Sequence, residues 1–212
     1  MKAEINMYAA CDRAIKSMNR EILRMFGQLK MAKWDEVQII RVVTETYRKS
    51  AKKARNHYYE VGFEAYLLAL AICGVDHRKA QRMAEKAITD EWVEMVLTQT
   101  DPVTLYRFDT ETERKAMRLA EALEEARDRN LEIDRAIRYW SRQLGQYAIN
   151  VTDYAETKAF EDAKIEMAEW VTQKDERVCV ECHALDGRVF PVDEFPVKPH
   201  IGCRCRKRPV FR

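Results

Sequence analysis

Proline and glycine are scarce over most of the chain. Residues 1 to about 168 contain one proline, Pro102, and four glycines, whereas four prolines follow from Pro191 onward. Because both residue types interrupt regular elements, this distribution predicts helix through the first part and loop in the last. A chain of 212 residues without a Gly/Pro/Ser-rich linker also predicts one main body with a small appendage.

The chain also has no long apolar run. The longest extends only from Ala65 to Val75, which is too short to cross a bilayer, and the N-terminal sequence has no uninterrupted signal-peptide core. We therefore expect no membrane partner and a protein made and used in a cytosol. In such a reducing compartment, paired cysteines are more often metal ligands than disulfides.

Neither sign of charge dominates, and the familiar catalytic motifs are missing. The chain has 37 Lys and Arg against 35 Asp and Glu, so any contact with nucleic acid must be local. It contains no G-x-S-x-G, no P-loop, no H-E-x-x-H and no Glu-x-x-His pair of the di-iron type. We expect no enzymatic activity.

What the first part does contain is helical periodicity. Apolar residues at alternating spacings of three and four predict three amphipathic helices, of which the first two are close in sequence and predict an antiparallel hairpin. The three stripes are Tyr8, Cys11, Ile15, Met18, Ile22, Met25 and Leu29; Val37, Ile40, Thr44, Tyr47, Ala51, Ala54, Tyr58 and Val61; and Ile133, Ile137, Trp140, Leu144, Tyr147, Val151 and Tyr154.

Local signals set further helix boundaries. They predict a buried helix from about Phe63 that stops at Gly74, a helix from Asp76 through Trp92 that ends at Thr100-Asp101-Pro102, and a charged helix from Asp109 or Thr110 to about Asn130.

Two signals near the end of the helical part predict a change of structure. Asp153 and Glu156 have the spacing of a capping box, which predicts a break near Asn150 to Asp153. Short strands are expected at Trp170 to Thr172 and at Arg188 to Phe190, the second after an Asp186-Gly187 turn.

Metal-ligand residues are concentrated near the C-terminus. Four of the six cysteines and two of the four histidines fall between positions 179 and 205, a density that packing alone does not require. Thiolate and imidazole ligands in a tetrahedral arrangement suit zinc, and a C-x-x-C pair forms a compact chelating turn. The six residues are Cys179, Cys182, His183, His200, Cys203 and Cys205.

The candidate ligands outnumber the four positions of a tetrahedral site. Cys179 and Cys182 form the first pair; the second is either Cys203 with Cys205, or His200 with one of them. His183 follows a ligand directly and is expected to point away. The expected cofactor is a structural zinc ion, whose binding free energy of about 10–16 kcal/mol decides whether so small a tail folds. The C-x-x-C-H string also fits c-type haem attachment, but that requires export and leaves the second cysteine pair unexplained.

A basic run overlaps the last cysteine pair, with no acidic residue from position 203 onward. Its candidate contact residues for DNA phosphates or an acidic partner are Arg204, Arg206, Lys207 and Arg208. This run supports an alternative function, a zinc-dependent nucleic-acid-binding protein, beside a plain solubilising role for the tail.

The ordered tail motifs resemble those of the phage Mu F-like minor head proteins, also called phage head morphogenesis proteins. Trp170 and Thr172 precede the C-x-x-C turn, Leu185-Asp186-Gly187 follows it, and Pro199-His200-Ile-Gly-Cys203-Arg204-Cys205 closes the motif. The helix segment Thr152-Asp-Tyr-Ala-Glu156-Thr157 also fits, and Ile201 departs from the family's usual proline. The resemblance covers about residues 137 to 210.

The resemblance implies a minor structural protein of a tailed phage or prophage head. Such a protein associates with the portal and other head proteins during capsid assembly and in handling packaged DNA. Its expected location is the virion, inside the capsid, and the host cytoplasm during assembly. We therefore expect a mainly α protein, α+β overall: a long helical hairpin or bundle as the body at residues 1–130, then a Mu F-like minor head domain at 131–212 whose zinc-binding tail spans about 169–212.

Overall fold

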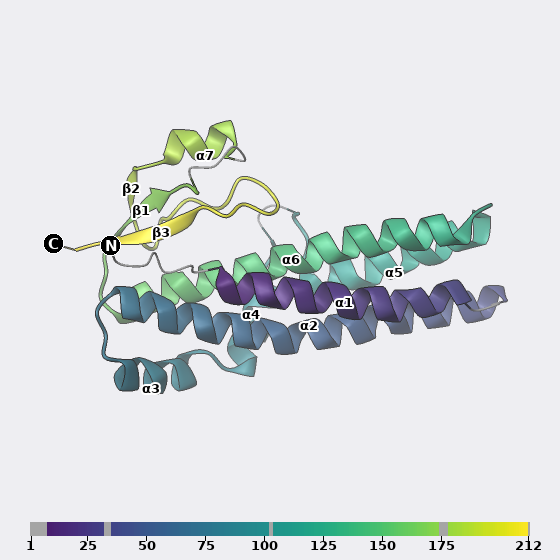
Figure 1. Ribbon diagram of the computed structural model, residues 1–212, viewed down its shortest axis with the longest axis horizontal. Coiled ribbons are helices and arrows are strands. Elements are labelled where there is room, and N and C mark those ends of the chain that lie inside the picture. The colour runs from purple at the N-terminus through teal and green to yellow at the C-terminus, as the bar shows by residue number, and fades with distance from the viewer. Residues whose placement is uncertain (1–7, 32–34, 102–103, 174–177, 212) are drawn as a thin grey trace.

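The computed structural model describes residues 8–31, 35–101, 104–173 and 178–211. Helices dominate it, and a small antiparallel sheet lies at the C-terminal end, as the sequence predicts (Figure 1). In chain order the elements are α1 (Ala9–Met31), α2 (Glu36–Ile72), α3 (His77–Ala87), α4 (Asp90–Thr98), α5 (Phe108–Glu125), α6 (Arg129–Asp162), β1 (Met167–Val171), α7 (Val180–Leu185), β2 (Val189–Pro191) and β3 (Arg206–Val210).

Helices α1 and α2 form the predicted antiparallel hairpin. Asp35 begins α2 with a capping box, because its side chain accepts from the backbone N–H of Gln38 and the Gln38 side chain accepts from the backbone N–H of Asp35. The two predicted helices up to Gly74 are one continuous helix, and Gly74 follows its end with a φ of 78°.

The second predicted stripe is displaced by one residue near its start. Ile39 is 1% exposed, whereas Ile40, which the spacing placed in the stripe, is 53% exposed. The side chain of Val37, the first member of that stripe, lies outside the described residues. From Tyr47 onward the predicted positions are buried.

Several other predicted boundaries are wrong. The helix that starts after Asp76 divides in two, because the Thr89 side chain accepts from the backbone N–H of Trp92 and begins α4. Helix α4 ends at Thr98; Pro102 lies outside the described residues. The charged helix α5 starts slightly earlier and ends earlier than predicted.

The break predicted near Asn150 to Asp153 is absent, because α6 runs without interruption through those positions. The Thr152 hydroxyl donates to the Ala148 carbonyl within the helix, and the Asp153 carboxylate accepts a hydrogen bond from Tyr8. Glu156, the partner in the supposed capping box, is 1% exposed. The polar residues that suggested a cap instead face other parts of the fold.

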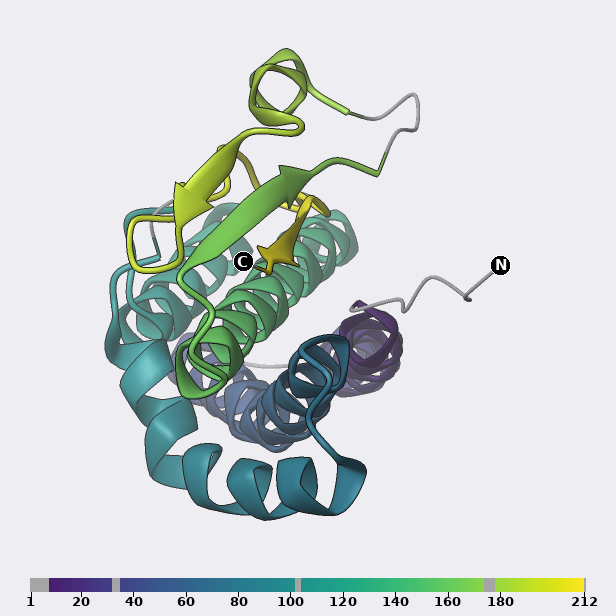
Figure 2. The ribbon, with the colours of Figure 1, turned by 90° about the vertical axis from the view of Figure 1, so that its left-hand side faces the viewer.

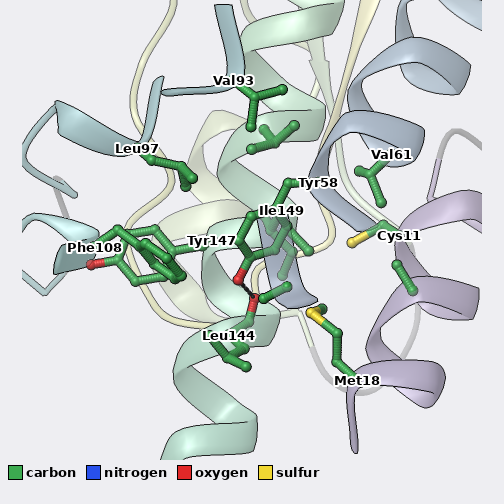
Figure 3. Packing of buried hydrophobic residues seen from close by; sticks show 14 of the residues in the cluster. Cys11, Met18, Tyr58, Val61, Val93, Leu97, Phe108, Leu144, Tyr147 and Ile149 are labelled. Carbon is green, nitrogen blue, oxygen red and sulfur yellow. Dashed lines mark hydrogen bonds between the residues drawn. The ribbon is translucent and has the colours of Figure 1, made fainter. Parts of the chain in front are cut away.

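One continuous core joins α6 to the earlier helices. Its buried residues extend along the chain from Tyr8 to Val192. In this core the Tyr58 hydroxyl of α2 donates to the Leu144 carbonyl of α6 over 2.9 Å (Figure 3). Packing is close at Gly62 of α2, where an added Cβ would lie 3.0 Å from the Trp92 ring. The division at residue 130 stays a prediction, and α6 shares this core with α1 and α2.

The C-terminal sheet has the strand order β2-β1-β3, with both pairs antiparallel. Both predicted strands are present with shifted ends. The basic run was not predicted to form a strand, yet it forms β3, in which Lys207 pairs with Trp170 of β1. Helix α7 was also missed. Figure 2 shows the sheet on one side of α6, with α3 at the opposite edge of the helical body.

Among the residues that the structure describes, no helix is both long and apolar enough to span a membrane.

Candidate metal centre

The first cysteine pair is positioned by the start of a helix. Cys179 is the N-cap of α7, and its sulfur accepts from the backbone N–H of Cys182 over 3.3 Å. The end of β1 is held to this segment by Asp186, whose carboxylate accepts from the backbone N–H and the hydroxyl of Thr172. The C-x-x-C turn is therefore a helix N-terminus in which the two cysteines lie in contact.

The second group comes from a tight turn before β3. The backbone N–H of Cys203 donates to the carbonyl of His200, and Gly202 between them has a φ of 77°, which glycine adopts without strain. This turn brings the imidazole and the thiol together beside Cys182.

Distances within the cluster fit a tetrahedral metal site. The sulfur of Cys182 lies 3.5 Å from that of Cys203 and 3.8 Å from Nε2 of His200. With metal–ligand lengths of about 2.3 Å for sulfur and about 2.0–2.1 Å for nitrogen, a tetrahedron has ligand–ligand edges of roughly 3.6–3.8 Å. These two distances are compatible with ligands around one ion.

All five predicted ligands are brought together. Ligand atoms of Cys179, Cys182 and His200 lie within 4.8 Å of one another, and so do those of Cys182, Cys203 and Cys205. Cys182 belongs to both groups. The cluster can hold a metal ion, and it offers one ligand more than a tetrahedral site uses.

The two histidines near the cysteines differ in position. His183 is exposed and belongs to neither group. His200 has its other ring nitrogen, Nδ1, 3.1 Å from the carbonyl oxygen of Ile201. A hydrogen bond from Nδ1–H to this carbonyl leaves Nε2 as the ligand atom, which is how ligating imidazoles are usually held.

The pKa values of three cysteine thiols in the cluster are shifted in different directions. A hydrogen bond from Cys205 is the main factor that lowers the pKa of Cys203 to about 5, whereas burial raises the pKa of Cys182 to about 12. The hydrogen bond with Cys203, followed by burial, raises the pKa of Cys205. Several adjacent thiolates repel each other, so this donor set suits a divalent cation that binds deprotonated sulfur.

An aromatic side chain covers the cluster. Trp170 of β1 is 1% exposed and packs with Cys182, Cys203 and Cys205. Phe195 stacks on Trp170 with ring centroids 5.5 Å apart. These rings exclude water from one side of the sulfur atoms.

The helical body holds the backbone of the metal loop from outside. The Gln146 side chain in α6 accepts from the backbone N–H of Gly202 over 2.9 Å. The Tyr8 hydroxyl lies 3.1 Å from the Cys205 carbonyl and 2.8 Å from the Asp153 carboxylate, either of which can accept its proton.

Lys198 completes this set of contacts. Its ammonium pairs with Asp153 over 3.0 Å, donates to the Cys203 carbonyl over 3.3 Å, and also donates to the Tyr8 hydroxyl. We call Tyr8, Gln146, Asp153 and Lys198 the clamp. Nothing in the sequence indicates this role for these four residues, because their contacts join positions far apart in the chain.

The basic run is divided between the surface and the interior. Lys207 points inward, where its ammonium donates to the Thr157 hydroxyl and the Asp153 carbonyl. Arg208 is exposed and pairs with Glu169 of β1.

The two remaining candidate contact residues of this run, Arg204 and Arg206, are partly exposed. Binding of nucleic acid through the run stays a prediction, and its arginines are the part that reaches the surface.

The fold and the cluster together define a class: a helical protein with a small C-terminal β element built around cysteine and histidine side chains. Residues 114–208 match the sequence profile of the family described as Phage Mu protein F like protein. The matched part begins within α5 and includes α6 and all five candidate ligands. For this part of the chain the match confirms the resemblance to that family. No match was found among curated proteins or among solved structures.

Proposed function

We propose that the protein is a minor structural component of a tailed phage or prophage head, which associates with the portal during capsid assembly and DNA handling. The observation that carries this proposal is the family match at residues 114–208, which includes the complete Cys/His cluster. The implied partners are the portal and other head proteins. The implied locations are the virion and, during assembly, the host cytoplasm.

The proposed cofactor is one zinc ion in a structural role. The cluster supplies at least four thiolate and imidazole ligands, and a set of four protein ligands leaves no open position for a substrate. Such a closed site supports a role without catalysis. Zinc would fix the Cys179 to Cys205 loop against the body, where Gln146 and Tyr8 contact its backbone.

For head assembly, the consequence is that zinc binding would give the surface of the metal loop one fixed shape. The small cluster around Trp170 buries little apolar surface, so metal binding would supply much of the free energy that orders the loop. With zinc bound, the corner formed by Arg204, Arg206 and His200 would keep one arrangement for a neighbouring head protein. The helical body would supply the remaining contacts.

Fractionation of a phage-producing lysate tests the proposal. Heads, free portal assemblies and unassembled proteins are separated, and this chain is measured in each fraction by quantitative mass spectrometry. We expect the chain in the head fraction at low copy number relative to the major capsid protein. Its presence among unassembled proteins alone would contradict a structural role in the head.

A further inference from the structure

Helix α3 carries a row of basic side chains on the outside of the molecule. Its inner face contains Ala80 and Ala84, which are 2% and 0% exposed and let α3 pack closely on the body. Figures 1 and 2 show α3 at the edge of the body, on the far side from the sheet. Four exposed cations lie on this helix, and we call them the α3 stripe: Arg78, Lys79, Arg82 and Lys86.

The stripe is continuous along the helix. Arg78, Arg82 and Lys86 follow one another at intervals of four residues, so they lie nearly in line, and Lys79 lies beside them. At 1.5 Å per residue the row from Arg78 to Lys86 is about 12 Å long. Phosphates of one DNA strand advance by about 3.4 Å each along the duplex axis, so the row spans about three to four of them.

The acidic residue before α3, Asp76, caps the helix by accepting hydrogen bonds from the backbone N–H groups of Arg78 and Lys79. None of the four side chains forms an ion pair within the parts of the chain that the structure describes. The acidic residue of α3, Glu85, instead accepts a hydrogen bond from Gln81. Four cations against one acid give α3 a net charge of +3, although the whole chain carries only +2.

Helix α5 differs from α3 in the pairing of its charged side chains. It is also rich in charge, but its cations and acids are interspersed, and several of them are in ion pairs. Glu111 pairs with both Arg114 and Lys115, and Glu113 pairs with Arg48 of α2. A cation that is paired with an acid contributes less to the positive potential at the surface than an unpaired one. The α3 stripe has no such pairing and so keeps its positive potential.

The surface of α3 suits a polyanion better than a protein partner. Protein interfaces have an apolar centre, and none of the exposed large hydrophobic side chains in the described part of the chain lies on α3. We propose that the α3 stripe binds the phosphate backbone of double-stranded DNA without sequence preference. This inference rests on the DNA-handling part of the proposed function and deepens it, and it assigns the contact to a helix outside the matched residues 114–208.

Salt-dependent binding of DNA tests the assignment. The full-length, zinc-loaded protein is titrated against a fluorescent duplex of mixed sequence, and the dissociation constant is measured by anisotropy at several KCl concentrations. Four phosphate contacts predict a slope of about −3.6 for the logarithm of affinity against the logarithm of salt, or a loss of roughly 100-fold between 50 and 200 mM.

The test variant replaces all four cations of the stripe by glutamine, in R78Q/K79Q/R82Q/K86Q. Glutamine is a good helix former, so the helix is retained, and an unchanged Tm confirms folding. The matched control, R118Q/R127Q/R138Q/R142Q, removes the same charge from four exposed arginines elsewhere. We expect the stripe variant to lose at least about 10-fold in affinity and most of the slope, and the control to lose less than about threefold.

Three outcomes would overturn the assignment. Unchanged binding by the stripe variant would remove α3 from the contact. Equal losses in both variants would show that net charge alone attracts the duplex. More effective competition by polyglutamate than by duplex DNA of equal charge would indicate an acidic protein partner. The head role is tested separately by fractionation, so either idea can fail while the other survives.

Discussion

Loss of Lys198 should destabilise the attachment of the metal loop to the helical body. The side chains of Lys198 and Asp153 are only 10% and 19% exposed, so their ion pair is largely shielded from solvent. Lys198→Met removes this pair and the hydrogen bond to the Cys203 carbonyl, and it leaves the Asp153 carboxylate without this cation. Breaking a buried pair in this way costs about 3–5 kcal/mol, and the remaining exposure of Asp153 reduces the expected loss to about 2–3 kcal/mol.

The matched control is an exposed ion pair between β3 and β1. Arg208→Gln breaks the pair with Glu169, in which the arginine side chain is 61% exposed, and it should cost less than about 1 kcal/mol. For a chain of this length, about 1 kcal/mol corresponds to about 2–4 °C in Tm. Thermal unfolding of the zinc-loaded proteins should therefore show a loss of about 5–10 °C for Lys198→Met and little change for Arg208→Gln. Equal Tm values for the two variants would refute a structural role for the clamp.

Three further changes probe the metal cluster, the core and a buried carboxyl. Cys182→Ser removes the ligand common to both groups. If one of four ligands supplies a quarter of the binding free energy of about 10–16 kcal/mol, a chelator competition should show zinc binding weaker by about 100- to 1,000-fold. Cys73→Ser, outside the cluster, should bind zinc like the wild type. Gly62→Ala should lower the free energy of unfolding by about 1–3 kcal/mol through overpacking, whereas Gly27→Ala, where an added Cβ meets nothing within 4 Å, should raise it by up to about 1 kcal/mol. A denaturant titration that finds no difference between the two variants would contradict the packing described for α2. Burial raises the pKa of Glu156 from 4.5 to about 7, so the contribution of its protonated carboxyl to stability is present below pH 4.5 and is lost as the pH rises through 7. The Tm of Glu156→Gln relative to wild type should therefore increase from about pH 5 to about pH 8. A difference in Tm that stays constant over this range would count against the buried carboxyl.

The close approach of the candidate ligands could be predicted from the sequence because the information that brings them together is local. The C-x-x-C pair and the turn at Gly202 each place ligands by backbone geometry over a few residues. The helices of the body were also predictable, since buried residues recur with the helical period. Spacing alone could not select four ligands from five. In the structure His200 and Cys205 each lie in a group that contains Cys182, so both are candidate ligands.

The errors arose where tertiary contacts decide the local structure. The run Arg206 to Val210 has no apolar alternation, and it becomes a strand because β1 supplies its hydrogen-bond partners. The supposed cap at Asp153 lies inside α6, since its carboxylate is used by Tyr8 and Lys198 from other parts of the chain. Polar residues that bind distant partners resemble local caps when only the sequence is considered.

The clamp could not have been foreseen for the same reason. Tyr8 and Lys198 are 190 positions apart, and neither belongs to a motif. The inward direction of Lys207 depends on the register between β3 and β1, which places this side chain against α6. Such residues are identified only when the strand order is known.

Metal content is the most direct test of a zinc-held C-terminal element. The protein is purified without added metal or chelator, and native mass spectrometry counts the ions on each chain. We predict about one zinc per chain, retained in Cys73→Ser and present at reduced occupancy in Cys182→Ser. Hydrogen exchange on the same samples should show the segment from Cys179 to Cys205 protected only with zinc bound. Metal-free wild-type protein with that segment equally protected would contradict the proposed role of the ion.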